Sequence, residues 1–258
     1  MSLLTINNLS KKYRGAEVYS VEDLSLEVKE GEVFGFLGPN GAGKSTTIKC
    51  VTGILPYEQG SINVCGYDLK TNPLKAKQNM GFVSDDHMMY DQLTAREYIN
   101  FVADIYNVGV NDRKKRTEDL LEQFELTSVF DNQISSYSHG MKQKICVIGV
   151  LVHNPKLWIL DEPLTGLDPK SAFQLKEIMK NHCKEGNSVF FSSHMLDVVE
   201  KVCDRVAIIN KGKLIMSGDM DEIKGKSLEN IFLNVTGAVQ IEDKMDVNEG
   251  EIFSDENK

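Results

Sequence analysis

The segment from Gly38 to Thr46 combines the residue types that bind phosphate groups. It follows the apolar run Val33–Leu37 directly. Glycines let successive backbone N–H groups point at phosphate oxygens without a Cβ in the way, and a helix that starts there adds its positive dipole end. The sequence therefore predicts a nucleotide-binding loop between a buried strand and a helix. Its predicted binding residues are Gly38, Pro39, Asn40, Gly41, Ala42, Gly43, Lys44, Ser45 and Thr46.

Two side chains in this loop have the chemistry for a nucleoside triphosphate with Mg²⁺. Lys44 would place a mobile cation on the β- and γ-phosphates. Ser45 would ligate Mg²⁺ through its hydroxyl, because this small ion prefers oxygen ligands and keeps most of its waters. The simpler alternative, a glycine-rich turn with no ligand, does not explain why the loop separates a strand from a helix.

A second group of candidate residues ends the apolar run Leu157–Leu160, where Asp161 and Glu162 follow. Open α/β sheets bind ligands at the carboxyl ends of their strands. We expect Asp161 to hold Mg²⁺, directly or through water. Glu162 would point to the opposite side and act as the general base for an attacking water. The alternative is a strand that ends in solvated carboxylates.

The elements that must position these residues follow from the hydrophobic pattern. Short strands at residues 3–6, 24–28 and 62–64 predict an antiparallel edge, and a further strand ends before Asp85. Strands then alternate with helices: we expect strands at 157–160, 189–192 and 206–209, helices at 169–182 and 195–202, and a hairpin into residues 214–216. This alternation predicts an α/β fold with a largely parallel sheet flanked by helices.

The stretch between these parts, residues 86–150, is predicted to be all-helical. Residues 94–108 form an amphipathic pattern with Tyr98, Phe101, Val102 and Ile105 on one side, and residues 112–124 form a second helix with a very polar face. A third helix is expected at 145–152. The sequence thus predicts a helical lobe inserted into the α/β domain.

The residues that precede this third helix carry a family resemblance. They read Tyr137-Ser138-His139-Gly140-Met141-Lys142-Gln143-Lys144. With the phosphate loop and the Asp-Glu pair in the same order, the chain resembles the ATP-binding subunit of an ABC transporter over residues 3–236; that family's signature begins Leu-Ser-Gly-Gly-Gln. The resemblance implies a P-loop NTPase of the ABC type that binds ATP and Mg²⁺ and hydrolyses ATP.

In that family the signature of one subunit closes over the nucleotide held by the other. The resemblance therefore implies that Ser138 and the backbone N–H of Gly140 touch the γ-phosphate across a head-to-tail dimer, which is either a homodimer or a dimer with a sibling subunit. Tyr137 and His139 depart from the motif. Their effect on closure and turnover is left open.

Four more residues match positions of the family. Asp168 in Thr165-Gly166-Leu167-Asp168-Pro169 matches the D-loop aspartate at the dimer interface. His194 matches the switch histidine at the γ-phosphate, and Tyr13 matches the aromatic residue that stacks on adenine. Asp85 stands where the family places glutamine and would ligand Mg²⁺ as a carboxylate. Ordinary structural roles remain alternatives for His194 and Tyr13.

Domain organisation is predicted as an ATPase domain over residues 1–236 and an acidic, mobile tail over residues 237–258. The ATPase domain divides into a core of residues 1–85 and 151–236 and a helical subdomain of residues 86–150. The tail stretch from 241 to 258 contains seven acidic residues and two lysines, which is typical of a solubilising appendage.

Composition limits the classes of molecule that this chain could bind. The net charge of −9 gives no general basic surface for a nucleic acid, and the five cysteines lack metal-site spacing. No signal peptide and no run near 20 apolar residues is seen. We expect a cytoplasmic protein, peripheral on the membrane through a transmembrane permease. The candidate docking face for the permease lies within residues 86–110 and includes Met88-Met89-Tyr90 and Leu93. The alternative is that these residues pack in the core of the helical lobe.

The predicted function is ATP hydrolysis that energises transport through nucleotide-driven dimerisation. Two segments resemble those of the branch of the family that exports drugs, antibiotic peptides or lipids. They are the Gly-Met-Lys-Gln sequence in the signature region and the C-terminal segment Leu228-Glu229-Asn230-Ile231-Phe232-Leu233. The alternatives are a non-transport ABC ATPase and a regulatory subunit that binds ATP with little turnover. The sequence does not identify the cargo or the permease.

Overall fold

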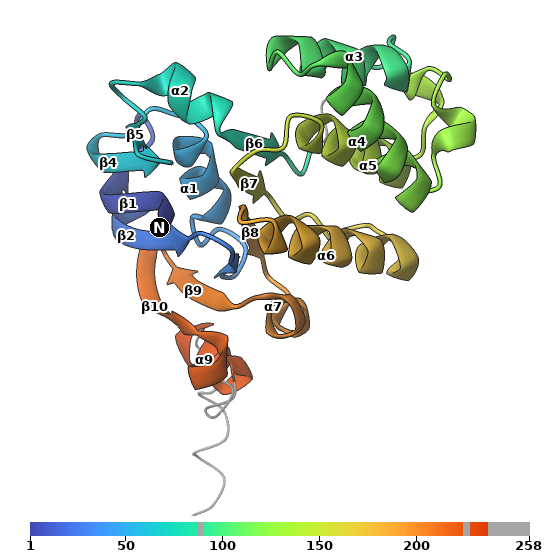
Figure 1. Ribbon diagram of the computed structural model, residues 1–258. Helices are drawn as coiled ribbons and strands as arrows, with labels where there is room; N and C mark the ends of the chain where they lie inside the picture. Colours follow the sequence, from blue (N-terminus) through green and yellow to red (C-terminus); the bar gives the residue numbers. More distant parts are fainter. Residues whose placement is uncertain (87–89, 224–227, 237–258) are drawn as a thin grey trace, which may run out of the picture.

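Two β-sheets organise the computed structural model, which describes residues 1–86, 90–223 and 228–236 (Figure 1). The larger sheet has the strand order β10-β9-β3-β8-β7-β6 and the smaller one β2-β1-β4-β5. The strands are β1 Ser2–Lys11, β2 Val21–Lys29, β3 Val33–Leu37, β4 Gln59–Val64, β5 Tyr67–Asp68, β6 Met80–Val83, β7 Leu157–Leu160, β8 Ser188–Ser193, β9 Arg205–Asn210 and β10 Lys213–Asp219. The expected α/β class is confirmed.

Helices lie between the strands of the larger sheet, and within the described residues two more follow its last strand. They are α1 Lys44–Val51, α2 Pro73–Gln78, α3 Ala95–Ile105, α4 Val110–Gln123, α5 His139–Leu151, α6 Pro169–Lys184, α7 Leu196–Val202, α8 Met220–Ile223 and α9 Leu228–Thr236, with 3₁₀ turns η1 Thr127–Val129 and η2 Ile134–Ser136. Strands β3, β6, β7, β8 and β9 are parallel, and only β10 pairs antiparallel, with β9. This arrangement brings the carboxyl ends of β3, β6, β7 and β8 to one edge.

The parallel strands bury both faces, which explains their unbroken apolar character. In β3, Val33 and Leu37 belong to a core that includes α5, α6 and α7. Phe34 and Phe36 belong to a second core, which includes α1 and the smaller sheet. The expected antiparallel region is a separate sheet of β1, β2, β4 and β5, whose buried apolar side chains pack in this second core.

Helices alone fill the described chain between β6 and β7, apart from one isolated bridge between Thr94 and Gln133. α3 begins with a capping box, in which Thr94 accepts from the backbone of Glu97 and the Glu97 carboxylate accepts from the backbone of Thr94. α5 begins at His139, six residues before the predicted start, because Ser138 caps it by accepting from Met141 N at 3.3 Å.

The predicted apolar side of α3 is wrong in part. Ile99 and Ala103 are buried, whereas Phe101 is 44% exposed and Ile105 is 59% exposed. Residues four apart share a helix face, so Ala103 lies on the buried face with Ile99. Tyr98 and Val102 pack against the same core, whereas Phe101 and Ile105 lie on the outer side. Two large apolar side chains of this helix, Phe101 and Ile105, are therefore only partly covered by the part of the chain that the structure describes.

A stacked pair and a hydrogen bond join the helices at the far end of α5. The ring of His153 stacks on Tyr106 with centroids 3.7 Å apart, and Arg116 Nη1 donates to Val152 O at 2.9 Å. Nearby, His182 Nε2 contacts Pro155 O at 2.9 Å and its ring meets Trp158 edge-on. No helix within the described ranges combines the length and apolar character needed to cross a membrane.

Acid should destabilise the fold through the two buried histidines. Burial lowers the pKa of His153 and of His182 to about 4, from an ordinary value of 6.5. Between these values the unfolded chain binds more protons, so the free energy of unfolding falls as pH falls through this window, by about 3 kcal/mol per histidine in total. Denaturant unfolding at pH 7 and pH 5 measures the fall.

The variant His153→Phe isolates one of these contributions. Phenylalanine keeps an aromatic ring against Tyr106, and His153 Nδ1 has no hydrogen-bond partner to lose. We expect a smaller loss of stability between pH 7 and pH 5 than in the wild type. An equal loss in both proteins would contradict the assignment.

Candidate functional site

The phosphate loop lies between the end of β3 and the start of α1, as its sequence predicts. Gly43, at φ 109°, precedes the first helical residue, Lys44. A Cβ at Gly43 would lie 2.5 Å from Ser20 O, so both its backbone conformation and the close approach of another chain segment require glycine. Gly43 and the first residues of α1, Lys44, Ser45 and Thr46, line an open space next to the loop.

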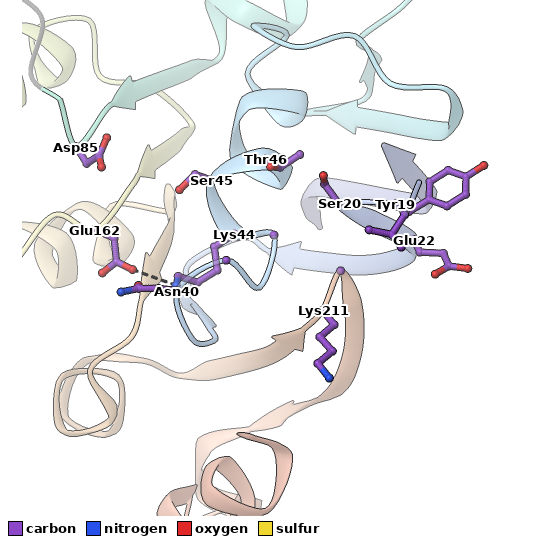
Figure 2. Close-up of a pocket in the computed structure, with 14 residues that line it drawn as sticks. Tyr19, Ser20, Glu22, Asn40, Lys44, Ser45, Thr46, Asp85, Glu162 and Lys211 are labelled. Atoms are coloured by element: carbon purple, nitrogen blue, oxygen red, sulfur yellow. Dashed lines mark ion pairs between the residues drawn. The ribbon is translucent and has the colours of Figure 1, made fainter. Parts of the chain in front are cut away.

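This space is a cavity of about 680 Å³ at the carboxyl edge of the parallel strands (Figure 2). Its lining residues come from the loop, from both sheets and from the turns between strands. They are Val18, Tyr19, Ser20, Glu22, Asn40, Gly41, Gly43, Lys44, Ser45, Thr46, Asp85, Glu162, Lys211 and Gly212. Lys44, Ser45, Asp85 and Glu162 gather at one end, and Tyr19, Ser20 and Glu22 lie at the other (Figure 2).

Lys44 and Glu162 form the central ion pair of the cavity. Lys44 Nζ lies 3.2 Å from Glu162 Oε1 and donates to Gly38 O at 2.7 Å and to Pro39 O at 3.2 Å. The other oxygen of Glu162 lies 2.9 Å from His194 Nδ1. One carboxylate is thus shared between a cation and an imidazole, an arrangement that can take up a proton and keep its orientation.

Asp161 points to the opposite side and is nearly inaccessible. Its Oδ1 accepts from Ser192 Oγ at 2.6 Å and from Ser45 Oγ at 3.2 Å. Its Oδ2 is buried without any hydrogen-bond partner. Burial raises the pKa of Asp161, and the neighbouring carboxylates of Asp85 and Glu162 raise it further. An unpartnered buried carboxylate oxygen beside a serine hydroxyl is a fitting ligand for a divalent cation.

The residues present fit Mg²⁺ held jointly by protein and phosphates. Among the described residues no group of three or more His, Cys, Asp or Glu side chains could hold a metal ion. Mg²⁺ in nucleotide sites takes one or two protein oxygens and completes its shell with phosphate and water. Ser45 and Asp161 offer such a pair, and Asp85 lines the same cavity.

The backbone explains why adjacent carboxylates diverge. Glu162 has a φ of 48°, in the left-handed region that is uncommon for residues other than glycine. Its N–H donates to Ser192 Oγ at 2.9 Å, and the same hydroxyl donates to Asp161. One serine of β8 therefore fixes the two acids on opposite sides of the strand end.

The sequence did not reveal one wall of the cavity. Gly212 N donates to Ala42 O at 2.8 Å, and Glu22 N donates to Gly212 O at 2.8 Å. The turn between β9 and β10 is thus hydrogen-bonded to the phosphate loop and stabilises its position. A Lys-Gly turn is visible in the sequence, but nothing local to it indicates which distant loop it contacts.

Some predicted residues lie outside this cavity. Tyr13 is 42% exposed and its hydroxyl lies 3.3 Å from Thr46 Oγ1, on a neighbouring cavity. Its stacking on adenine stays a prediction. The predicted residues that do not line the main cavity are Tyr13, Gly38, Pro39, Ala42, Ser138, Gly140, Asp161 and His194.

The signature segment lies apart from the phosphate loop within one chain. Ser138 caps α5, and Gly140 is near Leu167: a Cβ built there would lie 3.9 Å from Leu167 Cδ2. Asp168 caps α6 by accepting from Ser171 N at 3.0 Å, and its hydrogen bonds lower its pKa. Met141 is a third departure from the family signature, in place of glutamine.

Comparison with known proteins adds to this geometry. The family model described as ABC transporter matches residues 21–165. The linearmycin resistance ATP-binding protein LnrL of Bacillus subtilis (strain 168) is 38% identical over 86% of this chain and 70% of its own length. The SkfA peptide export ATP-binding protein SkfE of the same organism is 37% identical over 83% of this chain and 88% of its own length.

A solved structure titled as an ATP-binding subunit of an ABC transporter has the same fold. It is 31% identical, covers 91% of this chain with 99% of its own, and superimposes with a TM-score of 0.86. This chain therefore shares its fold with that protein over 91% of its length.

Replacing Asp161 by asparagine should separate stability from metal binding. Because burial raises the pKa of Asp161, its ionised form is disfavoured in the fold, and its contribution to stability is lost as pH rises above the ordinary carboxyl range. Asp161→Asn removes this charge and keeps an accepting oxygen. We expect a higher Tm at neutral pH and a Mg²⁺ affinity reduced at least about 10-fold, measured by thermal unfolding and by Mg²⁺ titration with nucleotide.

Asp168→Asn is the matched control, because the pKa of Asp168 is lowered rather than raised. It should not raise Tm and should leave Mg²⁺ affinity unchanged. A Tm of Asp161→Asn below that of the wild type would show that the buried charge is stabilised by its neighbours.

Proposed function

The chain belongs to the ABC transporter family of ATP-binding proteins, and on that basis we propose that it energises an export-type transporter through ATP-driven closure of a dimer. ATP binding and hydrolysis are the activities of its relatives' shared domain. The observation that carries the proposal is the Glu162 carboxylate, held between Lys44 at 3.2 Å and His194 at 2.9 Å at the end of β7. This geometry supplies a base next to a phosphate-binding loop.

We assign the ATPase domain to residues 1–236. Residues 1–85 and 151–236 form its core, and residues 86–150 form the helical subdomain that carries the signature. The acidic stretch 237–258 lies outside the described residues. The division is supported by the position of α3, α4 and α5, which occupy the chain between neighbouring parallel strands β6 and β7.

In the proposed mechanism the loop amides and Lys44 hold the β- and γ-phosphates. Glu162 accepts a proton from the attacking water, and His194 keeps the carboxylate oriented and senses the γ-phosphate. Ser45 and Asp161, with Asp85 beside them, would hold Mg²⁺, which when bound would neutralise charge on the phosphate oxygens. Positioning and charge stabilisation of this kind supply most of the rate in phosphoryl transfer.

The site needs a second subunit to be complete. Ser138 and Gly140 do not line the cavity of their own chain, while the amino end of α5 offers backbone N–H groups for an anion. We propose that they cover the triphosphate held by a second copy or by a sibling subunit. In this arrangement, nucleotide binding energy is converted into closure.

A neighbouring groove supports docking of a permease on the cytoplasmic face of the membrane. This second cavity, of about 610 Å³, lies between the end of α1, the end of β6 and the helices α3 and α5. Ile54 at its rim is 56% exposed, and Tyr90 packs edge-on against Phe101 outside it. The expected docking residues Met88 and Met89 lie outside the described residues. The exposed apolar side chains of Tyr90, Phe101 and Ile105 favour a protein partner.

Export is the direction that the relatives favour. One is named for resistance to linearmycin and another for export of the SkfA peptide. We propose a drug, peptide or lipid as the exported cargo. The second candidate is a regulatory or non-transport ABC ATPase, favoured by His139 and Met141, which replace a glycine and a glutamine of the family signature at the surface meant to cover nucleotide.

Glu162→Gln tests the proposed base. The amide cannot accept the proton of the attacking water, so hydrolysis should fall by about 10²- to 10⁴-fold while ATP binding persists. The stalled protein should then accumulate as an ATP-bound dimer, visible by light scattering with and without ATP. An unchanged hydrolysis rate, or a strictly monomeric stalled protein at saturating ATP, alone and with its membrane partner, would sink the proposal.

Phe101→Lys tests the docking face. A charge placed in a contact of exposed apolar residues should reduce co-purification with the integral membrane partner by at least about 10-fold. Phe173→Lys is the control, because Phe173 is 65% exposed but lies on α6. Equal losses in the two variants would remove α3 from the docking face. Binding of fluorescent ATP should be unchanged in both.

A further inference from the structure

Gln143 is a buried polar residue of α5 that no step of the mechanism above uses. It is 1% exposed, and its Nε2 donates to the backbone carbonyl of Pro163 in a short hydrogen bond. Its Oε1 is buried without a partner. Burying an amide whose oxygen has no hydrogen-bond partner costs free energy. The hydrogen bond to Pro163 is therefore the interaction that explains a glutamine at this position.

The carbonyl that it holds belongs to the residue after Glu162. The turn at Glu162 has left-handed backbone geometry and is closed by Thr165 N, which donates to Glu162 O at 3.2 Å. On the core side, Ser192 Oγ accepts from Glu162 N at 2.9 Å. On the other side, Gln143 holds Pro163. The strained turn is therefore fixed from both sides, once by β8 and once by α5.

The amino end of α5 packs on the same segment. A Cβ built on Gly166 would lie 3.7 Å from His139 Cδ2, and one built on Gly140 would lie 3.9 Å from Leu167 Cδ2. Leu164, Leu167 and Met141 all pack against the same apolar core. The signature end of α5 and residues 163–167 thus form one packed unit, with Gln143 as its buried hydrogen bond.

We infer that Gln143 is a positioning residue, which sets the turn of Glu162 and joins it to the end of α5 that faces the second subunit. The inference rests on the proposed function, in which Glu162 is the base and α5 covers the partner's nucleotide. When the signature of a chain binds the nucleotide of the second subunit, α5 and Gln143 then hold Glu162 of that same chain in position. Two sites that face different nucleotides become coupled within one chain.

The test compares Gln143→Met with Gln174→Met in the full chain. Methionine keeps the length of the side chain and removes the donor. Gln174 is the matched control: its Nε2 donates to Gln123 O at 2.7 Å between α6 and α4, and its Oε1 is also unpartnered. We expect kcat for ATP to fall about 10- to 100-fold in Gln143→Met, with KM and ATP affinity within about twofold of the wild type. Gln174→Met should retain kcat.

The Glu162→Gln background separates positioning from a purely structural role. If Gln143 acts through Glu162, single-turnover hydrolysis by the double variant should equal that of Glu162→Gln alone. A further fall of the same size as in the single variant would overturn the inference, as would an unchanged kcat in Gln143→Met. If Gln143→Met does not fold, as judged by its Tm, Gln143→Leu, which also lacks the donor, takes its place with the same expected outcomes.

The failure of the proposed function looks different. In that case Glu162→Gln itself hydrolyses ATP at the wild-type rate. If Glu162→Gln stalls while Gln143→Met and Gln174→Met behave alike, the proposed function stands and only the coupling through Gln143 is wrong.

Discussion

The site depends on two adjacent carboxylates that must face opposite ways at the end of one buried strand. Asp161 is turned toward Ser45 and Ser192, and Glu162 toward Lys44 and His194. Ionised groups are costly to bury unless they are paired or hydrogen-bonded. The two carboxylates have different partners. Glu162 contacts a lysine cation and an imidazole, whereas Asp161 keeps one buried oxygen without a hydrogen-bond partner. On that difference we base the proposal that Glu162 accepts the proton and that Asp161 holds the metal ion.

The fold provides this arrangement because parallel strands deliver their carboxyl ends to one edge. The phosphate loop follows β3, Asp85 follows β6, the two acids follow β7 and His194 follows β8. Apolar cores on both faces of the sheet fix these strand ends relative to one another. The loops that they carry can then hold uncommon backbone conformations, such as that of Glu162, because the surrounding packing determines them.

The remaining elements link this edge to other proteins. α5 starts next to the segment that follows Glu162, continues under α3, and ends beside His153 and Arg116. A single helix thus contacts the segment after the turn at Glu162, the proposed dimer surface and the lobe with the exposed apolar side chains. Such continuity is what a protein needs if binding at one surface is to bias geometry at another.

Local sequence determined a large part of this protein. Some patterns depend only on neighbours in the chain: the Gly38–Thr46 motif, the apolar run before Asp161, and the alternation of strands and helices. The phosphate loop, the strand Leu157–Leu160 and the α/β class could therefore be predicted. Tertiary structure alone decided the contacts between distant segments. It placed Ser20 and Gly212 against the phosphate loop, turned Phe101 outward, and brought Gln143 to Pro163. These contacts depend on how buried surfaces fit together, which no local pattern encodes.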